Sequence, residues 1–166
     1  MTETKFPDEA FRWWGALNNK ERPDTATLAD LRRCRTPVEV GFVPAFHDLR
    51  VRTGKNSRRE MLATARVAGV LAHVREHDGS RRVAAQLAAK SGNAGPVYAR
   101  ARFRKLMDTA DPDGERFMDT MVRAVRQLNG VVNVHDLADS VYWWNDHTRL
   151  QWARHYYENA PPEGGK

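Results

Sequence analysis

Closely spaced arginines mark Pro96–Ala110 (PVYARARFRKLMDTA) as a segment that could bind phosphate groups. Arginine suits that chemistry because its guanidinium is planar, always charged and able to meet two phosphate oxygens at once. On a helix, Arg100 and Arg104 would flank the apolar face on one edge, and Arg102 on the other. Positions three and four apart share a face of a helix. The apolar face predicted in this way contains Ala99, Phe103, Leu106, Met107 and Ala110.

The same division into an apolar face and a cationic face recurs in three more predicted helices. One helix begins at the Asp24 cap and ends in Arg32 and Arg33. The helix dipole also favours cations in a last turn, so part of that cluster needs no ligand. The other two helices carry arginines among apolar residues at helical spacing. These are Arg59 and Arg66 after the Ser57–Glu60 capping box, and Arg116, Arg123 and Arg126 in the helix Glu115–Leu128.

Residues suited to catalysis or metal binding form no strong pattern. The zinc-protease, phosphate-loop and hydrolase motifs HExxH, GxxxxGK and GxSxG do not occur. His73 and His77 have the spacing to share a metal, but no acidic or cysteine partner stands near them in sequence, so solvent-facing or phosphate-facing histidines are favoured. Three carboxylates could hold magnesium for nuclease chemistry, although ordinary helix positions explain them as well: Asp136, Asp139 and Asp146. We expect no catalytic residue, no bound metal and no cofactor.

The basic residues are concentrated in the middle of the 166-residue chain. Residues 31–110 carry seventeen basic and six acidic side chains, while both flanking parts are mildly acidic, and the net charge is +6. Such a block favours a polyanionic partner such as nucleic acid. The alternative is a solvated cationic surface in a protein generally rich in arginine.

Composition indicates a folded protein of the cytoplasm. Apolar residues make up 41% of the chain and charged residues 29%. No apolar run approaches the roughly 20 residues of a membrane span, so we expect no membrane association. The N-terminus lacks the pattern of a signal peptide. Cys34 is the only cysteine, which excludes an internal disulfide and is most simply structural.

The periodicity predicts an all-α fold. No alternating strand pattern is present, and Gly and Pro punctuate a series of helical segments, one of which is expected to begin at an Asn133 cap. The turn Ser91–Pro96 divides the chain into two helical lobes, residues 1–92 and 93–166, that pack into a compact bundle. Trp13 and Trp14 point about 100° apart on a helix, so one is expected in the core and the other at a contact or a half-buried edge. Val51–Asn56 is expected to be a basic, mobile turn.

Three stretches together resemble the small subunit of the type I-E CRISPR surveillance complex, the CasB family of Cascade. They occur in the family's order along nearly the whole chain: TLADLRRCRTP, ARFRKLM and LADSVYWWNDHTRLQWARHYY. The last is the most specific, because it combines an aromatic pair with Trp-Ala-Arg-x-Tyr-Tyr. The segment Val38–Asn56 lies outside the resemblance and inherits no role from it.

The resemblance implies an all-helical, non-enzymatic protein present in two copies beside the other Cascade subunits. It implies binding to guide RNA and target DNA, both hybrid and single-stranded, which stabilises the R-loop and the displaced strand in antiviral defence. Cleavage would belong to a recruited helicase–nuclease. The basic positions carried over from the family are Arg32, Arg33, Arg100, Arg102 and Arg104, to which the helical faces add Arg59, Arg66, Arg116, Arg123 and Arg126.

Two other functions fit the same residues. A free-standing helical DNA- or RNA-binding regulator would need polar base-reading side chains at the start of a recognition helix, where this chain has arginine but little Asn or Gln. A purely structural subunit would use its cations against acidic protein surfaces. Evenly spaced aromatic residues for base stacking are absent, so we expect recognition of the nucleic-acid backbone.

Overall fold

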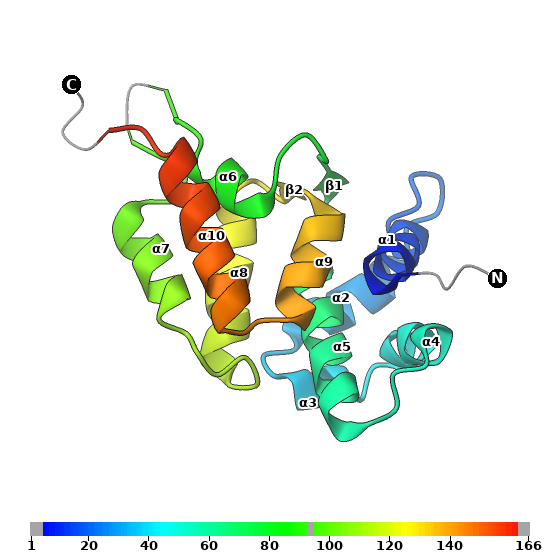
Figure 1. Ribbon diagram of the computed structural model, residues 1–166. Helices are drawn as coiled ribbons and strands as arrows, with labels where there is room; N and C mark the ends of the chain where they lie inside the picture. The colour runs from blue at the N-terminus through cyan, green and yellow to red at the C-terminus, as the bar shows by residue number, and fades with distance from the viewer. Residues whose placement is uncertain (1–4, 93–94, 163–166) are drawn as a thin grey trace.

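The computed structural model describes residues 5–92 and 95–162, and its fold is all-α, as predicted. Figure 1 shows the helices packed around one another. No helix in these ranges is long and apolar enough to span a membrane. The helices are α1 (Phe6–Leu17), α2 (Thr25–Arg33), α3 (Pro37–Val40), α4 (Pro44–Thr53), α5 (Arg58–Leu71), α6 (Val83–Ala88), α7 (Arg100–Met107), α8 (Glu115–Gln127), α9 (Val134–Tyr142) and α10 (Asp146–Asn159).

Helix α5 is the centre of the fold. Every residue from Ala63 to Leu71 is buried, and α5 contacts α1, α2, α3, α4, α8 and α9. Gly69 permits the closest of these approaches, because a Cβ there would stand 3.1 Å from the Val40 side chain and even nearer to that of Met118. These six helices therefore pack against one shared helix.

The predicted helix starts are confirmed where a polar side chain caps the helix. The Asp24 carboxylate accepts a hydrogen bond from the Thr27 backbone N–H at the start of α2. Ser57 and Glu60 form both bonds of the capping box before α5. Asn133 accepts from the backbone N–H of Asp136 and opens α9. Such caps satisfy backbone donors that have no partner within the helix.

The helix predicted over Pro96–Ala110 is shorter in the structure. Helix α7 begins only at Arg100, because the preceding residues are extended and bonded to the end of α6. The backbone N–H of Val97 donates to Ala89 O at 2.8 Å, and that of Tyr98 to Leu87 O at 2.9 Å. These long-range bonds compete with helix formation, which periodicity alone does not reveal.

One short parallel strand pair was not predicted. Strand β1 (Glu76–His77) pairs with β2 (Val131–Val132) at the upper edge of the molecule in Figure 1. The turn between α8 and β2 is sharp, with Asn129 at φ 57° and Gly130 at φ 73°. Two-residue strands are too short to show alternation in sequence.

The tryptophan pair and the basic turn also differ from expectation. Trp13 and Trp14 are both buried. The indole N–H of Trp13 donates to Ala45 O and that of Trp14 to Val74 O, both at 2.9 Å. A buried indole with a bonded N–H needs no outside partner. The predicted mobile turn Val51–Asn56 is partly helical, because α4 continues to Thr53 and ends at Gly54 with φ 67°.

Contacts between helices cross the predicted boundary between the two lobes. Helix α9 packs on α1 and α5, and α10 packs on α6. Residues 93 and 94, where the boundary was predicted, lie outside the described ranges. The division into residues 1–92 and 93–166 stays a prediction.

Arg66 is a structural residue and not part of a cationic surface, contrary to prediction. Its side chain is 6% exposed and donates to the carbonyls of Val141 and Tyr142 at the end of α9. It also pairs with Asp113 at 2.6 Å. Arg66 thus joins α5 to the end of α9 and to the turn before α8, through partners 47 to 76 residues away.

Replacing Arg66 therefore tests the fold. We expect Arg66→Ala to lower the free energy of unfolding by about 3 kcal/mol, because it leaves buried carbonyls without donors and breaks the ion pair of a buried arginine with the half-exposed Asp113. Arg59→Ala, in the same helix but exposed, is the matched control and is expected to change stability by less than about 0.5 kcal/mol. Urea unfolding followed by circular dichroism measures both, and equal losses would contradict the structural role of Arg66.

Candidate nucleic-acid interface

Six arginines from two parts of the chain lie along one groove. The groove has a volume of about 690 Å³ and runs between the end of α2 and the outer face of α8. Both helices contact α5, and His73, just beyond α5, helps to line the groove. We call it the arginine groove, and its arginines are Arg32, Arg33, Arg35, Arg116, Arg123 and Arg126.

Most of the positive charge in the arginine groove is not neutralised by carboxylates. Arg33 pairs with Asp30, and Arg123 pairs with Asp119 at 3.3 Å. Glu115 also lines the groove. Among the described residues, no carboxylate forms an ion pair with the remaining four arginines of the groove, Arg32, Arg35, Arg116 and Arg126.

The cations of the groove affect the pKa of His73, a residue that was expected to face solvent or phosphate. Burial lowers the pKa of His73 to about 4, and the cations of Arg126 and Arg32 add to the effect. Arg32 is held in place there, since its Nε donates to Ala72 O at 2.8 Å. The imidazole is therefore neutral at pH 7, and the groove's charge comes from its arginines.

Cys34 also lines the groove and is not activated as a nucleophile. Burial raises the pKa of its thiol, the carboxylates of Glu39 and Asp30 raise it further, and Arg33 opposes them. Its Sγ donates to Asp30 O at 3.4 Å. A thiol of raised pKa carries little thiolate at neutral pH.

The three predicted arginines of α7 are divided between two sides of that helix. Burial raises the pKa of the nearby Tyr98, and the cations of Arg102 and Arg123 oppose that shift. Arg102 is exposed, but it does not line the arginine groove. Arg100 instead donates to Pro161 O after α10, and Arg104, one turn further along the same edge, pairs with Asp108.

Arg59 lies in a different groove, beside an aromatic residue whose exposure was not predicted. This groove has a volume of about 840 Å³ and lies between the start of α5, the corner joining α9 to α10 and the turn near Pro112. Trp143 is 56% exposed on it. We call it the Trp143 groove. It shares no lining residue with the arginine groove, and Arg100, Arg102 and Arg104 line neither, so the predicted arginines do not all line one groove.

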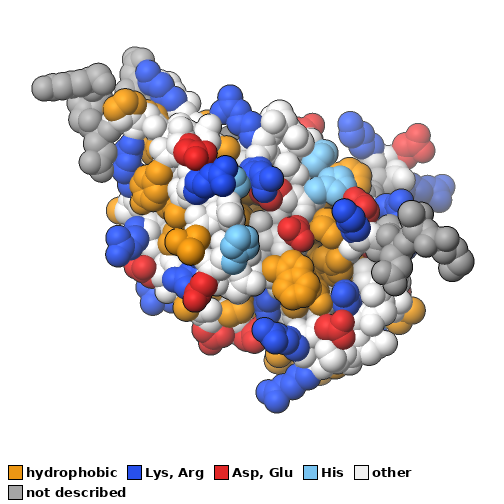
Figure 2. Space-filling view, viewed as in Figure 1, with side chains coloured by type: hydrophobic (Ala, Val, Ile, Leu, Met, Phe, Trp, Pro, Cys, Tyr) orange, Lys and Arg blue, Asp and Glu red, His pale blue; other side chains and the backbone are white. Residues whose placement is uncertain are grey.

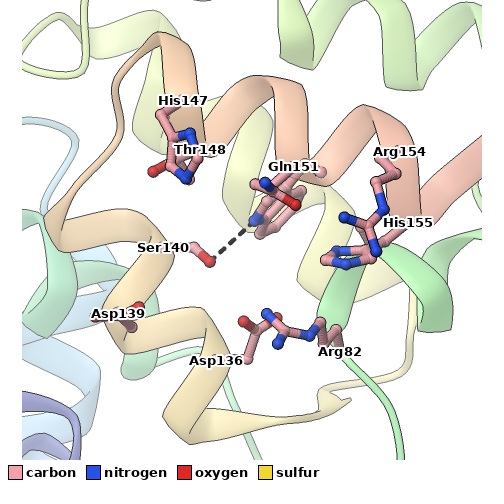
Figure 3. Close-up of a pocket in the computed structure, with 11 residues that line it drawn as sticks. Arg82, Asp136, Asp139, Ser140, His147, Thr148, Gln151, Arg154 and His155 are labelled. Carbon is pink, nitrogen blue, oxygen red and sulfur yellow. Dashed lines mark hydrogen bonds between the residues drawn. The ribbon is translucent and has the colours of Figure 1, made fainter.

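The carboxylates considered for magnesium binding do not gather. Figure 3 shows the pocket between α9 and α10 that Asp136 and Asp139 line, and Asp146 lies in the Trp143 groove instead. Asp136 accepts from the backbone N–H of Val83 at 2.8 Å and so caps α6. Within the described ranges, no group of three or more His, Cys, Asp or Glu side chains could hold a metal ion.

Ser140 and His77 also have structural roles, although His77 was expected to face solvent or phosphate. In the pocket of Figure 3, the Ser140 hydroxyl accepts from the Trp152 indole at 2.9 Å. The backbone N–H of Val134 donates to Nδ1 of His77, whose ring contacts Phe11 at 4.9 Å between centroids. His77 thus caps α9, and it does not face solvent with His73.

Sequence reasoning missed Arg35 and Trp143. Arg35 was visible as the last cation of the Arg-Arg-Cys-Arg run, and the structure places it in the arginine groove. Trp143 was seen only as one member of an aromatic pair. Its neighbour Trp144 is 4% exposed and donates to Thr109 O, so the two indoles have opposite environments.

Comparison with known proteins gives one family. Residues 27–157 match the family described as CRISPR-associated protein Cse2 (CRISPR_cse2). No curated protein matches the chain.

Two solved structures share the fold. One is a chain from the crystal structure of E. coli Cascade bound to a PAM-containing dsDNA target. It is similar with a TM-score of 0.69 and 21% identity over 90% of this chain and 93% of that one. The other is CasB from Thermus thermophilus, with a TM-score of 0.72 and 21% identity over 92% of this chain and 97% of that one. Since the family match covers most of its length, the chain belongs to the CRISPR-associated Cse2 family.

Proposed function

We propose that this chain is a non-catalytic, nucleic-acid-binding subunit of a CRISPR Cascade effector in the cytoplasm. Two copies, held beside the other Cascade subunits, would stabilise the R-loop formed by guide RNA and target DNA, together with the displaced strand, in antiviral defence. Family membership supports this proposal, as does the similarity to a chain of E. coli Cascade bound to double-stranded DNA.

The observation that carries the proposal is the convergence of six arginines in the arginine groove. Exchanging a DNA duplex for an RNA–DNA hybrid is nearly balanced in free energy, so a few backbone contacts suffice to shift it. Four of these arginines have no carboxylate partner among the described residues and can bind phosphate without first breaking an ion pair. Guanidinium–phosphate contacts carry no sequence preference, which fits a subunit that must accept any target.

Removing two unpaired arginines from the groove should weaken binding and its dependence on salt. We expect Arg116→Ala with Arg126→Ala to reduce the slope of log K against log salt concentration by about 1.4 for a single strand, since two phosphate contacts are lost. The measurement is a salt-titrated anisotropy assay with single-stranded DNA, repeated for R-loop formation by the assembled complex.

Arg12→Ala with Arg22→Ala is the matched control. It removes the same formal charge from exposed residues of α1 and the loop that follows, which do not line the groove. A control that loses as much affinity and slope as the groove variant would refute a localised interface. A strong preference for one DNA sequence would favour the free-standing regulator.

His73 provides a reporter of phosphate in the groove. Its pKa of about 4 reflects burial and the cations of Arg126 and Arg32. A bound phosphate favours the protonated imidazole, so the pKa of His73 should rise when single-stranded DNA binds. NMR titration of the imidazole in free and bound protein measures the change, and an unchanged pKa at saturation would show that the strand binds elsewhere.

A further inference from the structure

We propose that the Trp143 groove binds an unpaired nucleobase of single-stranded nucleic acid, which stacks on the Trp143 indole while the adjoining phosphate meets Arg59. The proposal adds a base-stacking site to a protein otherwise expected to contact only the nucleic-acid backbone. It rests on the proposed function only in that single-stranded nucleic acid must reach the chain.

The Trp143 indole is exposed yet held firmly. It is 56% exposed, whereas the other four tryptophans of the chain are at most 7% exposed. Its ring packs edge-on against Tyr142, with centroids 4.8 Å apart and planes at 74°. Tyr142 is itself 5% exposed and lies 4.5 Å from the Phe6 ring. The Trp143 ring is thus accessible to a ligand. Because its contacts already hold it in place, binding would cost it little side-chain entropy.

The backbone around Trp143 is fixed as well. Its N–H donates to Asp139 O at 3.1 Å, and its carbonyl accepts from the Thr148 hydroxyl at 2.5 Å. The residue therefore stands at a rigid corner between α9 and α10, and no motion of a loop is needed to present the indole.

Two cationic side chains, those of Lys55 and Arg59, line the Trp143 groove. Lys55 stands 5.3 Å from the centroid of the Tyr142 ring, and Arg59 is exposed without an ion-pair partner among the described residues. The acidic side chains of the groove are already paired: Glu60 with Lys55, Asp113 with Arg66 and Asp146 with Arg149. Arg59 is thus the groove's uncompensated cation within the described ranges, and an anionic partner complements it.

A nucleotide fits this arrangement better than a protein surface does. An aromatic platform beside a cation is the combination that sequence-tolerant single-strand binding uses. Figure 2 shows hydrophobic side chains over the end of α9 next to α5, bordered by Lys, Arg, Asp and Glu. A stable protein interface buries about 800 Å² per partner around an apolar centre, whereas here the groove offers one exposed indole.

Tryptophan fluorescence of the full chain tests the site directly. The probe is a single-stranded oligo(dT), compared with an abasic oligonucleotide of the same length and phosphate charge. We expect oligo(dT) to quench the emission of Trp143, and the abasic strand to bind without doing so. Trp143→Ala should weaken oligo(dT) binding about tenfold, the size of one base–aromatic stack, and leave abasic binding unchanged.

Two variants serve as controls. Trp143→Phe keeps an aromatic face and should retain most of the preference for oligo(dT) over the abasic strand. Leu150→Ala removes an apolar side chain that is 70% exposed on α10 and should have no effect.

Equal quenching by both oligonucleotides would overturn the proposal. So would a Trp143→Ala variant with normal oligo(dT) binding but weaker association with other Cascade subunits, which would assign the indole to a protein contact. The arginine-groove variant separates this inference from the proposed function. If oligo(dT) does not quench the wild-type chain while Arg116→Ala with Arg126→Ala lowers the salt slope as expected, only the stacking site is refuted. If oligo(dT) quenches the wild-type chain while that double variant keeps the wild-type slope, only the arginine groove is refuted.

Discussion

The burial of Ala63–Leu71 of α5 is the constraint on which the rest of the structure depends. This part of the helix is buried among its neighbours, so a charged side chain within it must find partners inside the protein. Arg66 meets this requirement with two carbonyls from the end of α9 and the carboxylate of Asp113. The same contacts fix the corner after α9, where Trp143 stands. A buried arginine in the core and an exposed indole at the surface are therefore parts of one arrangement.

The enclosed helix also explains how distant cations come together. Helices α2 and α8 both contact α5, and His73, which follows α5, lies between their arginines. Each helix buries its apolar residues inward and leaves its basic edge at the shared border. Convergence thus follows from packing on a common neighbour, without any contact between the arginines themselves. The cations of α7 divide because that helix lies between α8 and the residues that follow α10.

Local signals predicted much of the fold, and long-range contacts explain the rest. The caps at Asp24, Ser57 and Asn133 depend on residues three positions apart and were readable from sequence. The start of α7 was not, because carbonyls near the end of α6 hold the preceding residues extended. Five arginines of the arginine groove were identified from helical faces and from the family resemblance. Arg66 was misassigned because its seven-residue spacing from Arg59 gives orientation along one helix but says nothing about the neighbour on that side.

The base of the arginine groove has a chemical consequence of its own. Its two titratable neighbours, the Cys34 thiol and the His73 imidazole, have pKa values displaced in opposite directions, and both are uncharged around neutrality. Neither group therefore adds charge to the groove around neutrality, where its positive charge comes from guanidinium groups that do not lose their protons in proteins. A polyanion bound there would be held with a strength that depends little on pH around neutrality and more on ionic strength.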